Sequence, residues 1–199
     1  MATGNRPEVP VLAVVSGPPG SGKTTLAREV ARTLGLPLIC RDEIKQGMVH
    51  RVPAAEADSE DLLNQRTLAA FFAVLETLLR AGVSVIAEAA FQDRLWRPGL
   101  EPLARLAEVR VIRCAVDAAV AHERIARRAE TDAHRAAHAD QDLLAAIAAG
   151  GYSTDSFVWI SLPVPTLTVD TTATQGYDPG LRDIVAFAAG AVSSTTPVP

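Results

Sequence analysis

The fold of this chain is decided by Gly17-Pro18-Pro19-Gly20-Ser21-Gly22-Lys23-Thr24. This stretch fills the pattern G-x-x-x-x-G-K-[ST] at every required position, which is the signature of a phosphate-binding loop. It follows an apolar run from Val11 to Val15 and precedes a helical pattern in which Leu26, Val30 and Leu34 recur about one turn apart. A strand, a loop and a helix in this order are the context in which the motif works. The sequence therefore predicts that the chain binds ATP or GTP.

The residues within the loop have separate expected roles. Pro18 and Pro19 carry no N–H group, so the backbone cradle for the phosphates has to come from Gly20 to Thr25. Lys23 is expected to reach the β- and γ-phosphates, and the Thr24 hydroxyl is expected to ligate Mg²⁺. The predicted nucleotide-binding residues of this segment are Gly17, Gly20, Ser21, Gly22, Lys23, Thr24 and Thr25.

Length and composition favour a single cytoplasmic domain. The 199 residues suffice for one domain, which we place at 1–192, followed by a flexible tail at 193–199. The formal net charge of −4 disfavours a general nucleic-acid or membrane surface. Cys40 and Cys114 each end an apolar run, so we interpret them as core residues in a reducing compartment. The sequence shows neither a signal peptide nor an apolar stretch of membrane-spanning length.

Short apolar runs alternate with helical patterns along the chain. A helix is expected from about 59 to 81, closed by Gly82, and a last helix is expected to open with Asp178 as N-cap and Pro179 as first residue. This alternation predicts an α/β fold with a parallel sheet that is covered on both faces. The predicted strands after the first are 36–40, 83–87, 109–114 and 165–169.

Ligands of such sheets bind beyond the carboxyl ends of the strands. Polar residues follow three of the predicted strands: Arg41 and Asp42 the second, Glu88 the third and Asp170 the fifth. Asp42 is our candidate for the group that faces the acceptor hydroxyl, although it could instead cap a helix that runs through Met48. Arg41 could anchor an anionic substrate or pair with a surface carboxylate. Glu88 follows the third strand in a Walker-B-like position, where it could serve Mg²⁺, contact substrate or form a structural ion pair.

Arginines gather in the segment after the fourth strand. They could close over the triphosphate as a lid and stabilise the transferred charge, with Arg124 and Arg128 preferred as catalytic residues and Arg127 as a nucleotide contact. Arg135 lies further along the same segment. Alternatively, Glu123 and Arg127 form an ordinary i,i+4 pair on a solvated helix.

Two other pairs of side chains carry weaker signals. His134 and His138 are four residues apart, but the glutamate of H-E-x-x-H is missing, so we interpret them as solvated rather than as zinc ligands. Trp96 and Trp159 could belong to the core or line a substrate cleft.

The chain resembles the small P-loop kinases of the AAA-type "predicted kinase" group, which includes polynucleotide 5′-kinase domains, gluconate-kinase-like enzymes, chloramphenicol phosphotransferase and zeta-toxin-like kinases. The resemblance rests on residues 17–25, the pair Arg41-Asp42, and residues 83–91 and 169–172. It implies a P-loop NTPase three-layer α/β sandwich whose five-stranded parallel sheet has the order 2-3-1-4-5.

The resemblance also implies roles for individual residues. The aspartate that matches Asp42 acts on the acceptor hydroxyl, arginines of the 124–128 region form the lid, and Asp170, Thr171 and Thr172 lie near the nucleotide base. Many relatives have aspartate where this chain has Glu88, and the longer side chain shifts the carboxylate by more than a bond length. We therefore keep both metal and substrate as roles for Glu88.

These observations predict an ATP- and Mg²⁺-dependent phosphotransferase that acts on a hydroxyl of a small molecule, such as an antibiotic, a sugar or a nucleoside; GTP stays possible as the donor. Residues 44–65 are expected to hold the acceptor together with Arg41, Glu88, Phe91, Gln92, Arg94 and Trp96. The rival interpretations are a 5′-hydroxyl polynucleotide kinase and a non-catalytic nucleotide switch. The acceptor and the oligomeric state stay open.

Overall fold

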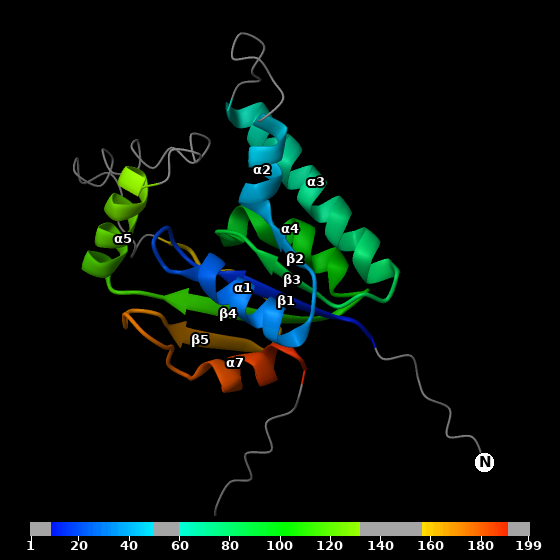
Figure 1. Ribbon diagram of the computed structural model, residues 1–199. Helices are drawn as coiled ribbons and strands as arrows, with labels where there is room; N and C mark the ends of the chain where they lie inside the picture. Colours follow the sequence, from blue (N-terminus) through cyan, green and yellow to red (C-terminus); the bar gives the residue numbers. More distant parts are fainter. Residues whose placement is uncertain (1–8, 50–59, 132–156, 191–199) are drawn as a thin grey trace, which may run out of the picture.

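The computed structural model describes residues 9–49, 60–131 and 157–190. Its sheet has five parallel strands in the order β2-β3-β1-β4-β5, as predicted (Figure 1). The strands are β1 (Val11–Ser16), β2 (Leu38–Cys40), β3 (Val85–Glu88), β4 (Glu108–Ala115) and β5 (Thr166–Asp170). The helices of these ranges are α1 (Lys23–Leu34), α2 (Arg41–Val49), α3 (Glu60–Arg80), α4 (Asp93–Leu103), α5 (Ala118–Thr131) and α7 (Leu181–Ala188).

Helices cover both faces of the sheet, and the central strand shows why. Successive side chains of a strand point to opposite faces, and every residue of β1 from Leu12 to Ser16 is buried. Leu12 and Val14 belong to the core that α3 and α4 cover. Ala13 and Val15 belong to the core under α1 and α7 (Figure 1). A strand buried on both faces reads as a continuous apolar run, which is the pattern that the sequence shows.

The predicted limits of the strands and of α3 agree with the structure to within two residues. The start of the last helix was predicted wrongly: α7 begins at Leu181, with Gly180 at the N-cap position. The backbone N–H and C=O of Asp178 are hydrogen-bonded to Asp170, at 3.1 and 2.7 Å, so Asp178 extends the pairing of β5 instead of capping a helix. The peptide bond to Pro179 is cis.

Helix α3 corrects the expectation about membrane-spanning length. It has 21 residues and contains an 18-residue window with a mean hydropathy of 1.2, so it is long and apolar enough to cross a membrane by length and composition alone. However, Phe71, Leu75 and Leu79 are buried against the sheet, and an apolar helix that packs on a protein core passes the same test. One face of α3 therefore packs on the core of this fold.

Candidate active site

The phosphate-binding loop joins β1 to α1 at the carboxyl end of the central strand. Gly20 and Gly22 have φ angles of 77° and 72°, a left-handed conformation that favours glycine. A Cβ atom added to Gly20 would lie 2.5 Å from the carbonyl oxygen of Ala121 in α5. The motif thus has glycine where the loop turns and where α5 crosses it closely.

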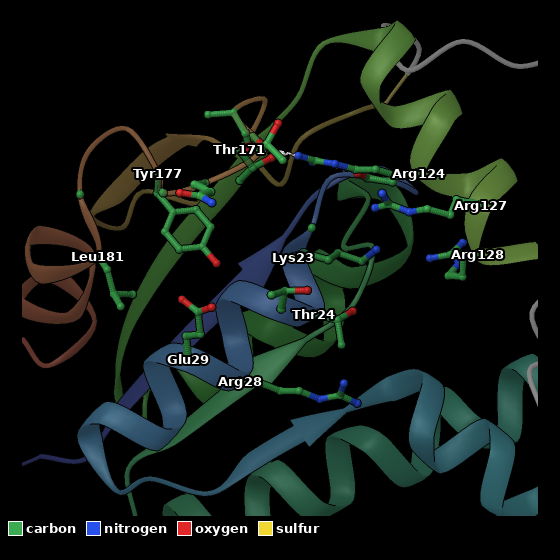
Figure 2. A pocket seen from close by; sticks show the side chains of 18 residues that line it. Lys23, Thr24, Arg28, Glu29, Arg124, Arg127, Arg128, Thr171, Tyr177 and Leu181 are labelled. Atoms are coloured by element: carbon green, nitrogen blue, oxygen red, sulfur yellow. Dashed lines mark hydrogen bonds between the residues drawn. The ribbon is translucent and has the colours of Figure 1, made fainter. Parts of the chain in front are cut away.

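A cavity of about 920 Å³ opens beside this loop (Figure 2). It runs from the N-terminal half of α1 to α5 on one side and to the segment between β5 and α7 on the other. Most of the predicted nucleotide-binding residues line it together, whereas Gly17, Ser21 and Asp170 do not. The lining residues are Gly20, Gly22, Lys23, Thr24, Thr25, Arg28, Glu29, Arg124, Arg127, Arg128, Thr171, Ala173, Thr174, Gln175, Gly176, Tyr177, Gly180 and Leu181.

Glu88 lies directly beneath the loop. Its side chain is 1% exposed, its Oε2 accepts a 3.2 Å hydrogen bond from the Thr24 hydroxyl, and its Oε1 lies 4.0 Å from Lys23 Nζ. Oε1 is buried and accepts no hydrogen bond. A buried carboxylate that lacks a hydrogen-bond donor on one oxygen, next to a hydroxyl, is a donor set that suits Mg²⁺.

The described residues contain no group of three or more His, Cys, Asp or Glu side chains that could hold a metal on its own. Mg²⁺ usually binds through one or two protein oxygens together with substrate phosphates and water. Thr24 and Glu88 therefore fit Mg²⁺ that arrives with a nucleotide, and they do not form a closed protein cage.

Cys40 differs from its interpretation as a plain core residue. It is buried as expected, but its thiol donates a 2.9 Å hydrogen bond to Glu88 Oε2. Burial, followed by the charge of Glu88, raises the pKa of the Cys40 thiol to about 12. Burial likewise raises the pKa of Cys114 to about 12. Both cysteines are free thiols.

Arg124 joins the loop to the segment that follows β5. Its guanidinium donates to the carbonyl oxygens of Thr171 at 2.7 Å and of Gly20 at 3.4 Å. It lies within 3.5 Å of the carbonyl oxygens of Thr172 and Ala173 as well. Because backbone carbonyls occupy the guanidinium, Arg124 ties together two walls of the cavity in this conformation. Arg127 and Arg128 extend from the same helix beside it (Figure 2).

The wall formed after β5 is polar. The Thr171 hydroxyl lies within hydrogen-bonding distance of the carbonyl oxygens of Ser21 and Ala115, at 2.7 and 2.9 Å. Tyr177 lines the cavity together with Glu29 of α1 (Figure 2), and burial followed by the charge of Glu29 raises the pKa of Tyr177 to about 12. Hydrogen bonds from Thr172 lower the pKa of the exposed Asp170 carboxyl.

The pair Arg41–Asp42 lies outside the residues that line the cavity. Arg41 bonds to Asp42 at 3.1 Å and to Asn64 of α3 at 2.6 Å. Since α2 begins at Arg41, Asp42 lies inside the first turn rather than at the N-cap position. Its side chain is 37% exposed. Cys40, two residues before Asp42, is in register with Glu88 of β3. Because β2 and β3 both lie on one side of β1 in the sheet, Asp42 lies on the same side of the central strand as Glu88.

The other predicted substrate residues take different positions. Phe91 is fully buried, and its ring contacts those of Phe71 and Trp96, so this aromatic cluster belongs to the core. Arg94 is exposed on α4 and does not line the cavity. Trp159 packs against Phe157 and beneath the guanidinium of Arg113. Arg135, His134 and His138 lie outside the described residues.

Sequence reasoning missed part of the cavity wall. Glu29 and Arg28 lie in the second turn of α1, and Gln175, Tyr177 and Leu181 follow β5. The position of the last three residues could have indicated them, because residues that follow the carboxyl end of β5 lie at the edge where ligands bind such sheets. No motif marks these positions individually.

Residues 12–149 match the sequence model of a family described as "AAA domain". Curated relatives that match parts of this chain are named cytidylate kinase. The relative from Pyrobaculum aerophilum is 56% identical over 45 residues, which cover 23% of this chain and 22% of that protein. The relative from Nitratidesulfovibrio vulgaris strain DP4 is 36% identical over 84 residues, which cover 42% and 35%. The matches thus span only about a fifth to a third of the length of these relatives.

Solved structures resemble the whole fold. A protein from Chloroflexus aurantiacus J-10-fl, described as a "putative kinase", superposes with a TM-score of 0.73 at 25% identity, covering 93% of this chain and 100% of that one. The APS kinase CysC of Mycobacterium tuberculosis superposes with a TM-score of 0.58 at 17% identity, covering 92% and 98%. The predicted resemblance is confirmed: this chain belongs to the AAA domain family and has the P-loop kinase fold.

Proposed function

We propose that this protein is an ATP- and Mg²⁺-dependent phosphotransferase that moves the γ-phosphoryl group to a hydroxyl of a small molecule. The observation that carries the proposal is the contact of Thr24 with the buried carboxylate of Glu88 beside a cavity that four arginines line. Phosphoryl transfer needs positioning and charge stabilisation more than covalent chemistry, and this arrangement supplies both. GTP would fit the same phosphate cradle.

Each part of the site has a proposed task. Backbone N–H groups from Gly20 to Thr25 and the ammonium of Lys23 hold the triphosphate. The Thr24 hydroxyl and the Glu88 carboxylate would hold Mg²⁺, which when bound offsets negative charge on the phosphates. Arg127 and Arg128 stabilise the charge that develops on the transferred group. Arg124 positions the loop, and the segment from Thr171 to Tyr177 faces the nucleotide base.

Asp42 is the proposed acceptor-facing group. It orients the acceptor hydroxyl for in-line attack on the γ-phosphorus and accepts its proton. The new bond joins the acceptor oxygen to phosphorus, while the bond from phosphorus to the β–γ bridging oxygen breaks and the nucleoside diphosphate leaves. The strand order supports this role, because β2 and β3 deliver Asp42 and Glu88 to the same side of the loop.

A small-molecule acceptor is favoured by the neighbours of this fold. They include proteins named as a sugar kinase from Janibacter sp. HTCC2649 and a gluconokinase from Sinorhizobium meliloti 1021. A further neighbour lies in the Pnkp1/Rnl/Hen1 RNA repair complex, so a 5′-hydroxyl polynucleotide belongs among the acceptors to be tested. The net charge of −4 favours the small molecule over a strand of nucleic acid. Two buried, free cysteines fit a reducing compartment such as the cytoplasm.

The test is transfer of label from γ-labelled ATP with Mg²⁺ into pooled sugars, nucleosides, hydroxylated antibiotics and a 5′-hydroxyl oligonucleotide. Label is expected in one acceptor class and is expected to disappear with Lys23→Ala. Label that appears only as inorganic phosphate, at the same slow rate with every pool, would contradict the proposal and favour a nucleotide switch.

A further inference from the structure

The Cys40 thiol touches the carboxylate that faces the phosphate-binding loop. Cys40 ends β2 and is in register with Glu88 of β3. Its Sγ lies 2.9 Å from Glu88 Oε2, with the thiol as donor. Cys40 is 4% exposed and Glu88 is 1% exposed, so water does not compete freely for this hydrogen bond. The contact is therefore a fixed part of the site.

The two oxygens of Glu88 have different surroundings. Oε2 accepts from the Cys40 thiol and from the Thr24 hydroxyl at 3.2 Å. Oε1 has no hydrogen-bond donor and lies 4.0 Å from Lys23 Nζ. Two donors thus hold Oε2, whereas Oε1 faces Lys23, the residue expected to contact the phosphates.

We propose that Cys40 is a positioning residue whose thiol holds the Glu88 carboxylate in the orientation that presents Oε1 to the Mg²⁺–nucleotide. The inference rests on the proposed function, because it takes Glu88 to serve Mg²⁺. A glutamate has one more rotatable bond than an aspartate, and ordering that bond costs conformational entropy. A buried donor on the neighbouring strand fixes the bond before the ligand binds. Cys40 acts through Glu88 and does not itself touch the reacting atoms.

The first test is calorimetric titration with ATP in the presence of Mg²⁺ and, separately, in the presence of EDTA. Cys40→Val keeps a buried side chain of similar size but removes the donor. It is expected to weaken binding of Mg²⁺–ATP by about 3- to 10-fold, with less than about a 2-fold change in EDTA. Cys40→Ser keeps a donor and is expected to restore Mg²⁺–ATP binding to within about 2-fold of wild type.

Cys114 provides the matched control. It is also buried and free, but it belongs to β4 and makes no hydrogen bond with Glu88 among the described contacts. Cys114→Ala is expected to lower the thermal unfolding midpoint and to leave the ratio of the two affinities, with Mg²⁺ and with EDTA, at the wild-type value. If Cys40→Val does not fold, Cys40→Ala takes its place in the same titrations.

A double-mutant cycle separates positioning from packing. Glu88→Asp withdraws the carboxylate by about 1.5 Å, away from the thiol. If Cys40 acts through Glu88, then Cys40→Val in the Glu88→Asp background changes Mg²⁺–ATP affinity by less than about 2-fold. An equal loss in both backgrounds, or an equal loss with Mg²⁺ and with EDTA, would overturn the inference. These titrations need no acceptor, so they fail independently of the proposed transfer reaction.

Discussion

The guanidinium of Arg124 donates a 2.7 Å hydrogen bond to the carbonyl oxygen of Thr171, which lies 47 residues further along the chain. The same guanidinium reaches the carbonyl oxygen of Gly20 in the phosphate-binding loop. One side chain of α5 therefore holds two separate backbone segments that line the cavity. In this conformation Arg124 holds the loop, and Arg127 and Arg128 line the same cavity.

Replacing Arg124 should loosen both segments. Arg124→Ala leaves several backbone carbonyls without their charged donor, so we expect a loss of about 1–3 kcal/mol in the free energy of unfolding and weaker ATP binding. Arg128→Ala should lower the rate of transfer with a smaller change in stability. Chemical denaturation, calorimetric titration and the label-transfer assay on both variants check this. Equal stability of the two variants would contradict the difference in roles.

The close approach of Gly20 to α5 predicts a severe effect of a single methyl group. In Gly20→Ala the new Cβ would lie 2.5 Å from the Ala121 carbonyl oxygen, at a φ of 77°. The loop must move, so we expect nucleotide binding to fall below detection. Gly82→Ala is the matched control, since its φ is 78° but no atom lies within 4 Å of the new Cβ. It should cost only about 1–2 kcal/mol of backbone strain and leave binding intact, as titration and thermal unfolding will report.

The thiols predict a reactivity that depends on folding. Both cysteines are buried, and the pKa of each is raised to about 12 from 9.0. Because the pKa of each thiol is higher in the folded state than in the unfolded state, its contribution to stability is fully present below the unfolded pKa, near pH 9. This contribution is lost as the pH rises from 9 toward 12. At pH 8 we expect the folded protein to resist a thiol reagent for hours and the denatured protein to react at two thiols within minutes. Rapid reaction of the folded protein would refute the buried hydrogen bond of Cys40.

The sequence predicted those parts of the fold that follow from local rules. The spacing from Gly17 to Thr24 identified the loop, and the continuous apolar run of β1 predicted a strand buried on both faces. The pattern Asp178–Pro179 misled, because local chemistry that suits an N-cap cannot reveal that Asp178 pairs with Asp170 across a turn. A non-local pairing of this kind overrides the local preference.

In the candidate site, too, local patterns indicated some residues, whereas contacts between distant segments could not be predicted. The motif indicated Lys23 and Thr24, and the strand ends indicated Glu88. The hydrogen bond of Cys40 to Glu88 depends on the register of β2 against β3. The approach of Tyr177 to Glu29 on the cavity wall brings together residues nearly 150 positions apart. Neither contact leaves a mark in the local pattern, so only the folded chain reveals them.

We propose that Lys23 holds the nucleotide and that Asp42 directs its γ-phosphoryl group to an acceptor hydroxyl. The most direct measurement compares wild type, Lys23→Ala and Asp42→Asn for Mg²⁺–ATP affinity and for label transfer to the acceptor that the pooled screen identifies. We expect Lys23→Ala to lose both. We expect Asp42→Asn to bind Mg²⁺–ATP within about 2-fold of wild type and to transfer at least roughly 100-fold more slowly. Transfer at the wild-type rate by Asp42→Asn would contradict the account.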